Sequence, residues 1–186
     1  MPYPRLTLII ICATLLAYLI QLAVPGFTEA FSLTPESVFQ GHQYQLFTYM
    51  FLHDPSGLFH IAINMFVLLI FSGRLEKEIG WKYFLFVYLA SGIGSALLYM
   101  ALLPDPDALL LGASGSVFGV MAAFAVLNPA DWVFIPPGIP LPALAAIIII
   151  AFLEFFSGAL GLSPNIANFG HLGGIITGLL FISWWK

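Results

Sequence analysis

Three stretches of this chain place polar side chains with acid–base or nucleophilic chemistry inside otherwise apolar sequence. His60 and Asn64 are four residues apart, so on a helix they share one face. Ser114 stands in a glycine-rich segment that opens an apolar run, and His171 lies in a later run that is rich in small residues. A neutral imidazole can take the proton of a serine hydroxyl and so activate it for attack. The pattern predicts Ser114 as a nucleophile and His171 as its base.

The same residues could stabilise the negative charge that forms when a carbonyl is attacked. The His60 ring, the Asn64 amide and the backbone N–H of Ser114 are candidate donors to this oxyanion. A serine that begins a helix also lies beside the positive end of the helix dipole. Gly112 and Gly115 would let the backbone turn sharply and approach a substrate strand closely.

The composition indicates that membrane helices position these groups. The chain has 186 residues, of which 61% are hydrophobic and 8% are charged, whereas about a quarter of the residues in a soluble domain are charged. Its five Lys and Arg residues are too few to follow a nucleic-acid backbone. Runs of about 20 apolar residues predict transmembrane helices. We therefore predict an all-α polytopic membrane protein, a single domain over 1–186, with six spans near residues 6–24, 58–72, 83–103, 114–127, 142–159 and 168–185.

The polar groups of three spans are predicted to lie at one depth. His60, Ser114 and His171 each precede the inner end of their span, marked by Arg74, Asn128 and Trp185, by 14 residues. At about 1.5 Å per residue this is roughly 21 Å. In a hydrocarbon core about 30 Å thick, all three lie on the order of 9 Å below the outer boundary. This agreement supports a shared site.

The charges predict the orientation of the spans. With six spans, all five basic residues fall on one side, which the positive-inside rule places in the cytoplasm together with both termini. The acids on the other side include Asp54, Asp105 and Asp107, and the long segment from Pro25 to Gly57 is external and partly buried in the bilayer interface. The basic residues are Arg5, Arg74, Lys77, Lys82 and Lys186.

Small residues and one aromatic ring predict how the spans pack. Gly115 with Gly119, and Gly174 with Gly178, form stripes that allow close helix contact in lipid. Phe118 lies one turn after Ser114 on the same face and could stack on the His171 ring.

Each of these residues also has a plainer interpretation. A membrane serine is most often a packing residue, and His60 and Asn64 could simply join helices. His53 and His42 fall in the external segment, where solvation or a loop hydrogen bond is expected. Glu154 lies near the depth of the serine and the histidine. We favour a packing or water-lining role for it over a third catalytic role, and expect Glu154→Gln to retain most activity.

Taken together, these motifs resemble the rhomboid family of intramembrane serine proteases. The Gly-x-Ser-Gly signature reads Gly112 to Gly115, the His-x-x-x-Asn motif reads His60 to Asn64, and His-x-x-Gly-x-x-x-Gly reads His171 to Gly178. The run Phe47 to His53 is also similar. Where many members carry Trp-Arg, this chain has Tyr44 and Gln45.

The resemblance implies a six-helix bundle with a membrane-associated first external loop and a Ser114–His171 dyad. His60 and Asn64 would stabilise the oxyanion, supported by Gly112, Gly115, Phe118, Gly174 and Gly178. Transmembrane proteins would be the substrates, reaching the site beside the fifth span and the segment Gly161 to Ala167. No cofactor or metal is expected, since the lone cysteine and the lack of a His-Glu-x-x-His motif favour no metal site. The bare core favours a prokaryotic plasma membrane, and the oligomeric state is not predicted.

Two other functions are weighed against the protease. A rhomboid-like protein that binds transmembrane clients without cutting them is expected to lack Ser114 or His171, and both are present. A transporter is disfavoured because the polar residues stop high in the membrane and no inverted repeat is found.

Overall fold

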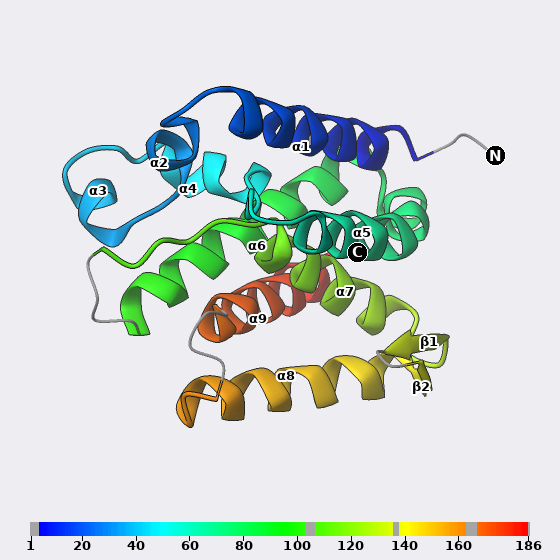
Figure 1. The fold of residues 1–186 in the computed structure, drawn as a ribbon. Coiled ribbons are helices and arrows are strands. Elements are labelled where there is room, and N and C mark those ends of the chain that lie inside the picture. Colours follow the sequence, from blue (N-terminus) through cyan, green and yellow to red (C-terminus); the bar gives the residue numbers. More distant parts are fainter. Residues whose placement is uncertain (1–3, 103–106, 136–137, 163–166, 186) are drawn as a thin grey trace.

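The computed structural model describes residues 4–102, 107–135, 138–162 and 167–185, and most of them are helical (Figure 1). Helices occupy all six predicted ranges: α1 (Arg5–Ala23), α5 (Leu58–Ile79), α6 (Trp81–Leu102), α7 (Ser114–Leu127), α8 (Ala143–Ala159) and α9 (Asn168–Trp184). Among the described residues, α1, α5 and α6 are long and apolar enough to cross a membrane, and α7 and α8 are apolar but shorter. The predictions about Leu103, Asp105, residues 163–166 and Lys186 lie outside the described residues.

The helix that contains the second predicted span is longer than the span, because α5 continues from residue 72 to Ile79. The added turns contain Arg74, Glu76, Lys77 and Glu78, which are good helix formers. Arg74 pairs with Glu78 one turn later at 2.7 Å. Charged residues mark where a helix leaves an apolar environment, and they do not have to end the helix.

The buried Glu76 carboxylate joins α5 to the start of α1. It accepts hydrogen bonds from the backbone N–H groups of Leu6 and Thr7 at 3.0 and 2.9 Å and from the Thr7 hydroxyl at 2.7 Å. A carboxylate at this position satisfies helix N–H groups that have no partner within α1 and complements its dipole.

The segment from Pro25 to Gly57, predicted to be external and called the external segment below, folds into short helices that the sequence analysis did not predict. They are α2 (Phe27–Phe31), α3 (Pro35–Phe39), α4 (Gln45–Thr48) and the 3-10 helix η1 (Tyr49–Phe51). An isolated antiparallel bridge between Leu33 and Leu110 ties this segment to the stretch before α7. The buried Tyr49 hydroxyl donates to the Gly92 carbonyl of α6 at 2.6 Å, so the segment is anchored on the helical bundle.

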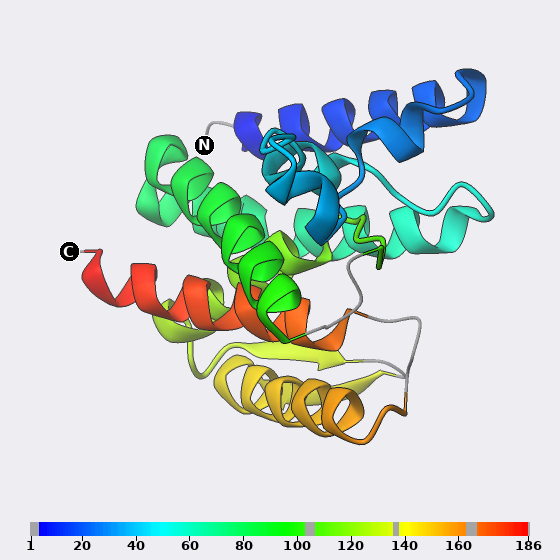
Figure 2. The same cartoon turned by 90° about the vertical axis from the view of Figure 1, so that its left-hand side faces the viewer.

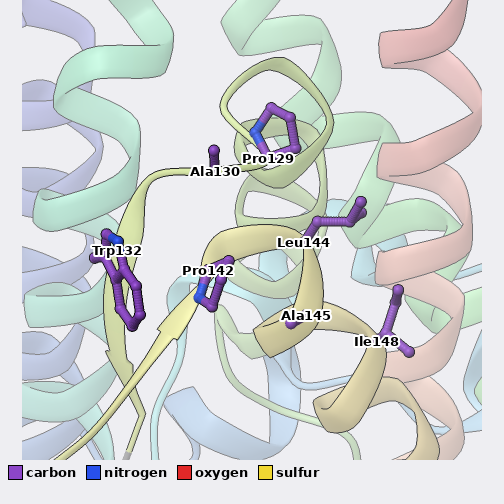
Figure 3. A pocket seen from close by; sticks show the side chains of 7 residues that line it. All are labelled: Pro129, Ala130, Trp132, Pro142, Leu144, Ala145 and Ile148. Atoms are coloured by element: carbon purple, nitrogen blue, oxygen red, sulfur yellow. The ribbon is translucent and has the colours of Figure 1, made fainter.

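A β-hairpin precedes α8 and was also not predicted. Strands β1 (Trp132–Ile135) and β2 (Ile139–Pro142) pair antiparallel, with Trp132 opposite Pro142. Beside the hairpin lies an open apolar groove of about 600 Å³ (Figure 3), lined by Pro129, Ala130, Trp132, Pro142, Leu144, Ala145 and Ile148. The groove contains none of the predicted site residues.

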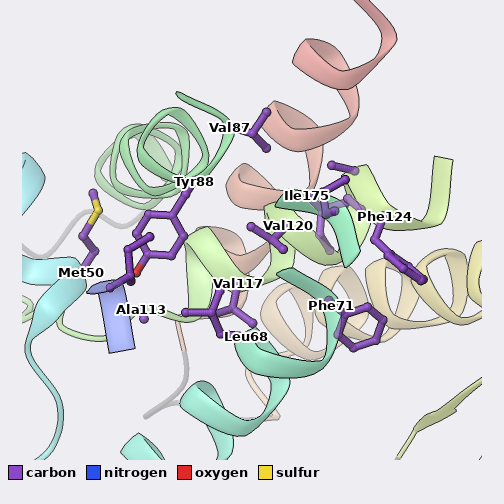
Figure 4. Close-up of a cluster of buried hydrophobic side chains, with 14 of the residues drawn as sticks. Met50, Leu68, Phe71, Val87, Tyr88, Ala113, Val117, Val120, Phe124 and Ile175 are labelled. Carbon is purple, nitrogen blue, oxygen red and sulfur yellow. The ribbon is translucent and has the colours of Figure 1, made fainter. Parts of the chain in front are cut away.

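The core lies where α5, α6, α7 and α9 meet. Its side chains include Leu68, Val87, Val120 and Ile175, one from each helix (Figure 4). The turned view in Figure 2 shows α9 beside both α6 and α8. Helix α8 lies at the edge of the bundle, on the side opposite α1 (Figure 1).

Glycines set the distance between α7 and α9. A Cβ added at Gly174 would overlap the Gly115 carbonyl oxygen, and one at Gly178 would overlap that of Gly119. The two predicted small-residue stripes therefore face one another, with backbone against backbone.

Candidate active site

Ser114 is the first residue of α7, and its position depends on the turn before it. Gly112 has a φ of 128°, a conformation that residues with a Cβ rarely adopt. Its N–H donates to the Tyr49 carbonyl at 3.0 Å. This turn delivers Ser114 at the N-terminus of α7, where the first N–H groups have no partner within the helix.

The Ser114 hydroxyl contacts the His171 imidazole. Ser114 Oγ and His171 Nε2 are 2.9 Å apart, joining the first turns of α7 and α9. The Phe118 ring lies 4.5 Å from the His171 ring, measured between centroids, at an interplanar angle of 35°. The hydroxyl, the imidazole and the stacked ring are thus in direct contact.

The opposite edge of the same imidazole faces an acid. His171 Nδ1 lies 3.1 Å from Glu154 Oε2, and the two side chains are 12% and 17% exposed. Asn168, which the sequence analysis did not single out, donates to the same Oε2 at 2.6 Å. Its place three residues before His171, on the same helix face, is the signal that could have revealed it.

His60 lies beside the turn that carries Ser114. A Cβ added at Gly112 would be 3.1 Å from His60 Cε1, so the imidazole packs directly on the Gly112 backbone. Asn64 is buried, and its amide donates to the His60 carbonyl at 2.9 Å. One N–H of the Asn64 amide is therefore used within α5.

His53 lies in the segment from Pro25 to Gly57, where the sequence predicts either a solvated histidine or a loop hydrogen bond. The side chain is fully buried, which excludes solvation and leaves the hydrogen bond. Its Nε2 faces the N–H of Ala113, the residue before Ser114, at 3.5 Å, and its ring meets the His60 ring edge-on at 5.0 Å. Burial, reinforced by the nearby His60, lowers the pKa of His53 to about 3, so this histidine is neutral at pH 7.

Tyr44 and Gln45 anchor the external segment through its own backbone. The Tyr44 hydroxyl and the Gln45 amide both donate to the Ala30 carbonyl, at 3.1 and 3.3 Å. These contacts close the segment without involving the groups around Ser114.

The sequence is similar to proteins of one known family. Residues 40–185 match the family model described as the Rhomboid domain. The chain belongs to the rhomboid family. It is 34% identical over 144 residues to "RHOMBOID-like protein 6, mitochondrial" of Arabidopsis thaliana, which covers 77% of this chain and 44% of that protein.

Two further rhomboid relatives have names that mention proteolysis. "Rhomboid-like protease 3" of Toxoplasma gondii is 32% identical over 143 residues, 77% of this chain and 52% of that protein. "Rhomboid-type serine protease 2" of Emericella nidulans is 35% identical over 131 residues, 70% of this chain and 24% of that protein. The chain thus spans about half or less of the length of these relatives.

These three rhomboid relatives come from eukaryotes, and the name of one includes a mitochondrial location. Apolar helices and family membership make the chain a membrane protein. A prokaryotic plasma membrane and the orientation of the termini stay predictions from the sequence.

Proposed function

We propose that this rhomboid protein is an intramembrane serine endopeptidase, with Ser114 as nucleophile and His171 as general base. The observation that carries the proposal is the 2.9 Å contact between Ser114 Oγ and His171 Nε2 at the start of α7. This distance suits direct proton transfer between the two groups. The names of the Toxoplasma and Emericella relatives point to the same activity.

The reaction begins with attack of Ser114 Oγ on the scissile carbonyl carbon while its proton passes to His171 Nε2. The imidazolium then returns this proton to the leaving amine, and an acyl-serine remains. Water attacks the acyl group with His171 again as base, which releases the carboxylic product and restores the hydroxyl. Phe118 holds the plane of the imidazole through both steps.

The oxyanion would be held by the backbone N–H of Ser114 together with the side chains of His60 and Asn64. His60 already packs on the turn at Gly112. Asn64 keeps one amide hydrogen on the His60 carbonyl, so the second hydrogen is the one it would offer. Gly112 and Gly115 support the turn, while Gly174 and Gly178 keep α9 close to α7.

The substrates we propose are transmembrane segments of other proteins. A peptide carbonyl within a helix is already hydrogen-bonded, so the substrate must unwind locally to present it to Ser114. Glycine, proline or β-branched residues near the cleavage point would favour this. In the same proposal residues 1–186 form one membrane domain whose six long helices all cross the bilayer, with both termini in the cytoplasm.

A fluorophosphonate probe tests the proposal, since it reacts covalently with activated serines. The detergent-purified protein is expected to be labelled, and Ser114→Ala and His171→Ala are expected to lose the label. Ser183→Ala is a matched control, because this exposed hydroxyl donates to the Leu180 carbonyl of its own helix. A folded wild-type protein that resists labelling would instead favour a non-cleaving binder of transmembrane clients.

A further inference from the structure

His171 has a second ring nitrogen, Nδ1, that takes no part in the contact with Ser114. Its Nε2 faces Ser114, and its Nδ1 points toward the Glu154 carboxylate on α8, 3.1 Å away. The contact is close but not in line, and within the described part of the chain the buried Nδ1 has no well-directed hydrogen bond. Such bonds are often misaligned in the absence of substrate and tighten when it binds.

The carboxylate is held in place from the helix that carries the base. Asn168 is buried and donates to Glu154 Oε2, the same oxygen that approaches His171 Nδ1. Asn168 and His171 are both in the first turns of α9, so the acid is aligned with the imidazole by α9 itself.

The residues that flank Glu154 on α8 are apolar. The next residues along α8 include Phe152, Leu153 and Phe155, each more than half exposed and apolar. A carboxylate in such surroundings is costly unless it is paired. Among the described basic side chains, His171 is the one within ion-pair distance of Glu154.

A serine–histidine site requires one particular form of the imidazole. To accept the serine proton, Nε2 must carry a free lone pair, which leaves the hydrogen of neutral histidine on Nδ1. Phe118 fixes the plane of the ring, but a stacked ring does not distinguish one nitrogen from the other. An acceptor beside Nδ1 does, and it also stabilises the imidazolium that forms during the reaction.

We propose that Glu154 is a positioning residue that holds His171 with its hydrogen on Nδ1 and stabilises its protonated form during turnover. The inference rests on the proposed function and deepens it from a pair to a Glu154–His171–Ser114 array. It also revises the sequence-based expectation of a packing or water-lining role. A hydrogen bond from Asn168 is enough to hold a packing carboxylate, and that role does not explain why the same oxygen lies 3.1 Å from His171 Nδ1.

Two substitutions separate the charge of Glu154 from its hydrogen-bonding oxygen. Glu154→Gln keeps an acceptor for Asn168 and Nδ1 but removes the charge, and Glu154→Leu removes both with little change in volume. Glu36→Gln is the matched control, since this exposed glutamate on α3 accepts a hydrogen bond from Gln40 on the same surface and loses the same charge.

The rate of probe labelling and the kcat on a cleaved transmembrane peptide are the first readouts. We expect Glu154→Gln to lower both by about tenfold, because a charge-assisted hydrogen bond is about twice as strong as a neutral one. Glu154→Leu is expected to lower them by about 100-fold or more, with KM changed less than kcat. Glu36→Gln should match the wild type. Folded Glu154→Leu protein that labels at the wild-type rate would overturn the inference.

The tautomer of His171 gives a readout that does not depend on activity. The ¹⁵N shifts of the four histidines are compared with those of His171→Ala to assign the signal. The wild type and Glu154→Gln are expected to carry the hydrogen on Nδ1, and Glu154→Leu is expected to shift toward Nε2. An unchanged tautomer in Glu154→Leu would refute the positioning role. An unlabelled wild type with the expected tautomers would instead refute the protease proposal alone.

Discussion

Gly174 sets the distance between the two helices that carry Ser114 and His171, and its replacement by alanine should separate them. A Cβ at this position would lie 2.8 Å from the Gly115 carbonyl carbon and even nearer its oxygen. Non-bonded carbon atoms pack at about 3.5 Å or more, so the contact with the carbonyl carbon alone requires α9 to move from α7 by at least roughly 0.7 Å, and the nearer oxygen requires more. No side-chain rotation can relieve this contact, because the Gly115 atoms belong to the backbone of α7 and the new Cβ is bonded directly to the backbone of α9.

This movement has a direct consequence for the contact between Ser114 and His171, because His171 lies one turn before Gly174 on α9. Adding this minimum displacement to the present 2.9 Å between Ser114 Oγ and His171 Nε2 gives about 3.6 Å or more, which is no longer a hydrogen bond. A misplacement of this size is expected to slow labelling and cleavage by about 100-fold. Overpacking of the interface should also lower the free energy of unfolding by about 1–3 kcal/mol.

Labelling rates and thermal unfolding in detergent measure the two effects separately. Gly73→Ala on α5 is the control, because its new Cβ would meet Pro4 at an ordinary 3.6 Å. Alanine in that helix should raise the free energy of unfolding by up to about 1 kcal/mol. Wild-type labelling and an unchanged midpoint in Gly174→Ala would refute the argument that backbone contact positions the dyad.

Three further perturbations test the framework around the site. Gly112→Ala should reduce labelling about tenfold to 100-fold, because a φ of 128° disfavours a residue with a Cβ and the new Cβ would displace His60. Gly57→Ala should leave the labelling rate unchanged, because the space around that position is open. Glu76→Gln should lower the free energy of unfolding by about 2 kcal/mol by weakening the bonds to Leu6 and Thr7. Lys77→Gln, at the exposed neighbouring position, should have little effect, and thermal unfolding measures both. Acidification should destabilise the fold through His53, because this histidine takes up a proton below pH 6.5 in the unfolded chain but only near its pKa of about 3 in the folded chain. Between pH 7 and pH 5 the free energy of unfolding should fall by at most about 2 kcal/mol. His53→Gln should flatten the dependence of the unfolding midpoint on pH.

The positions of the long helices were predictable because each one is an apolar run bounded by glycine, proline or charge. The pairing of Ser114 with His171 was also within reach of the sequence. It was inferred from the complementary chemistry of the two side chains, their equal depth and the glycine stripes that let α7 and α9 approach. Both signals depend on helix geometry, which is regular enough to extrapolate over several turns.

The missed elements are those whose form depends on tertiary contacts. The short helices of the external segment are far below the length at which an isolated helix is stable, so their conformation follows from packing. Proline at positions 140 and 142 obscured strand β2, although a two-stranded hairpin consists only of edge strands, where proline is tolerated. The role of Glu76 was hidden for another reason. Its partners at the start of α1 are 69 and 70 residues away in the sequence.

The same distinction separates the parts of the site from one another. Ser114 and His171 stand on helices locked together by glycine contacts, whereas Glu154 stands on α8, whose buried residues Ala143, Ala146 and Ile147 all lie in its first two turns. In the half of α8 that carries Glu154, the helix meets α9 through this carboxylate and through Gly158, which lies close to the Phe169 ring. A displacement of this half of α8 would therefore remove the acid from Nδ1 while the contact between Ser114 and His171 stayed intact. If Glu154 positions His171, substitutions that loosen α8 against α9, such as Phe169→Ala, should slow labelling by no more than Glu154→Leu does. The double variant Phe169→Ala/Glu154→Leu should then label at nearly the same rate as Glu154→Leu alone. Additive losses would mean that α8 and the carboxylate act on the site independently.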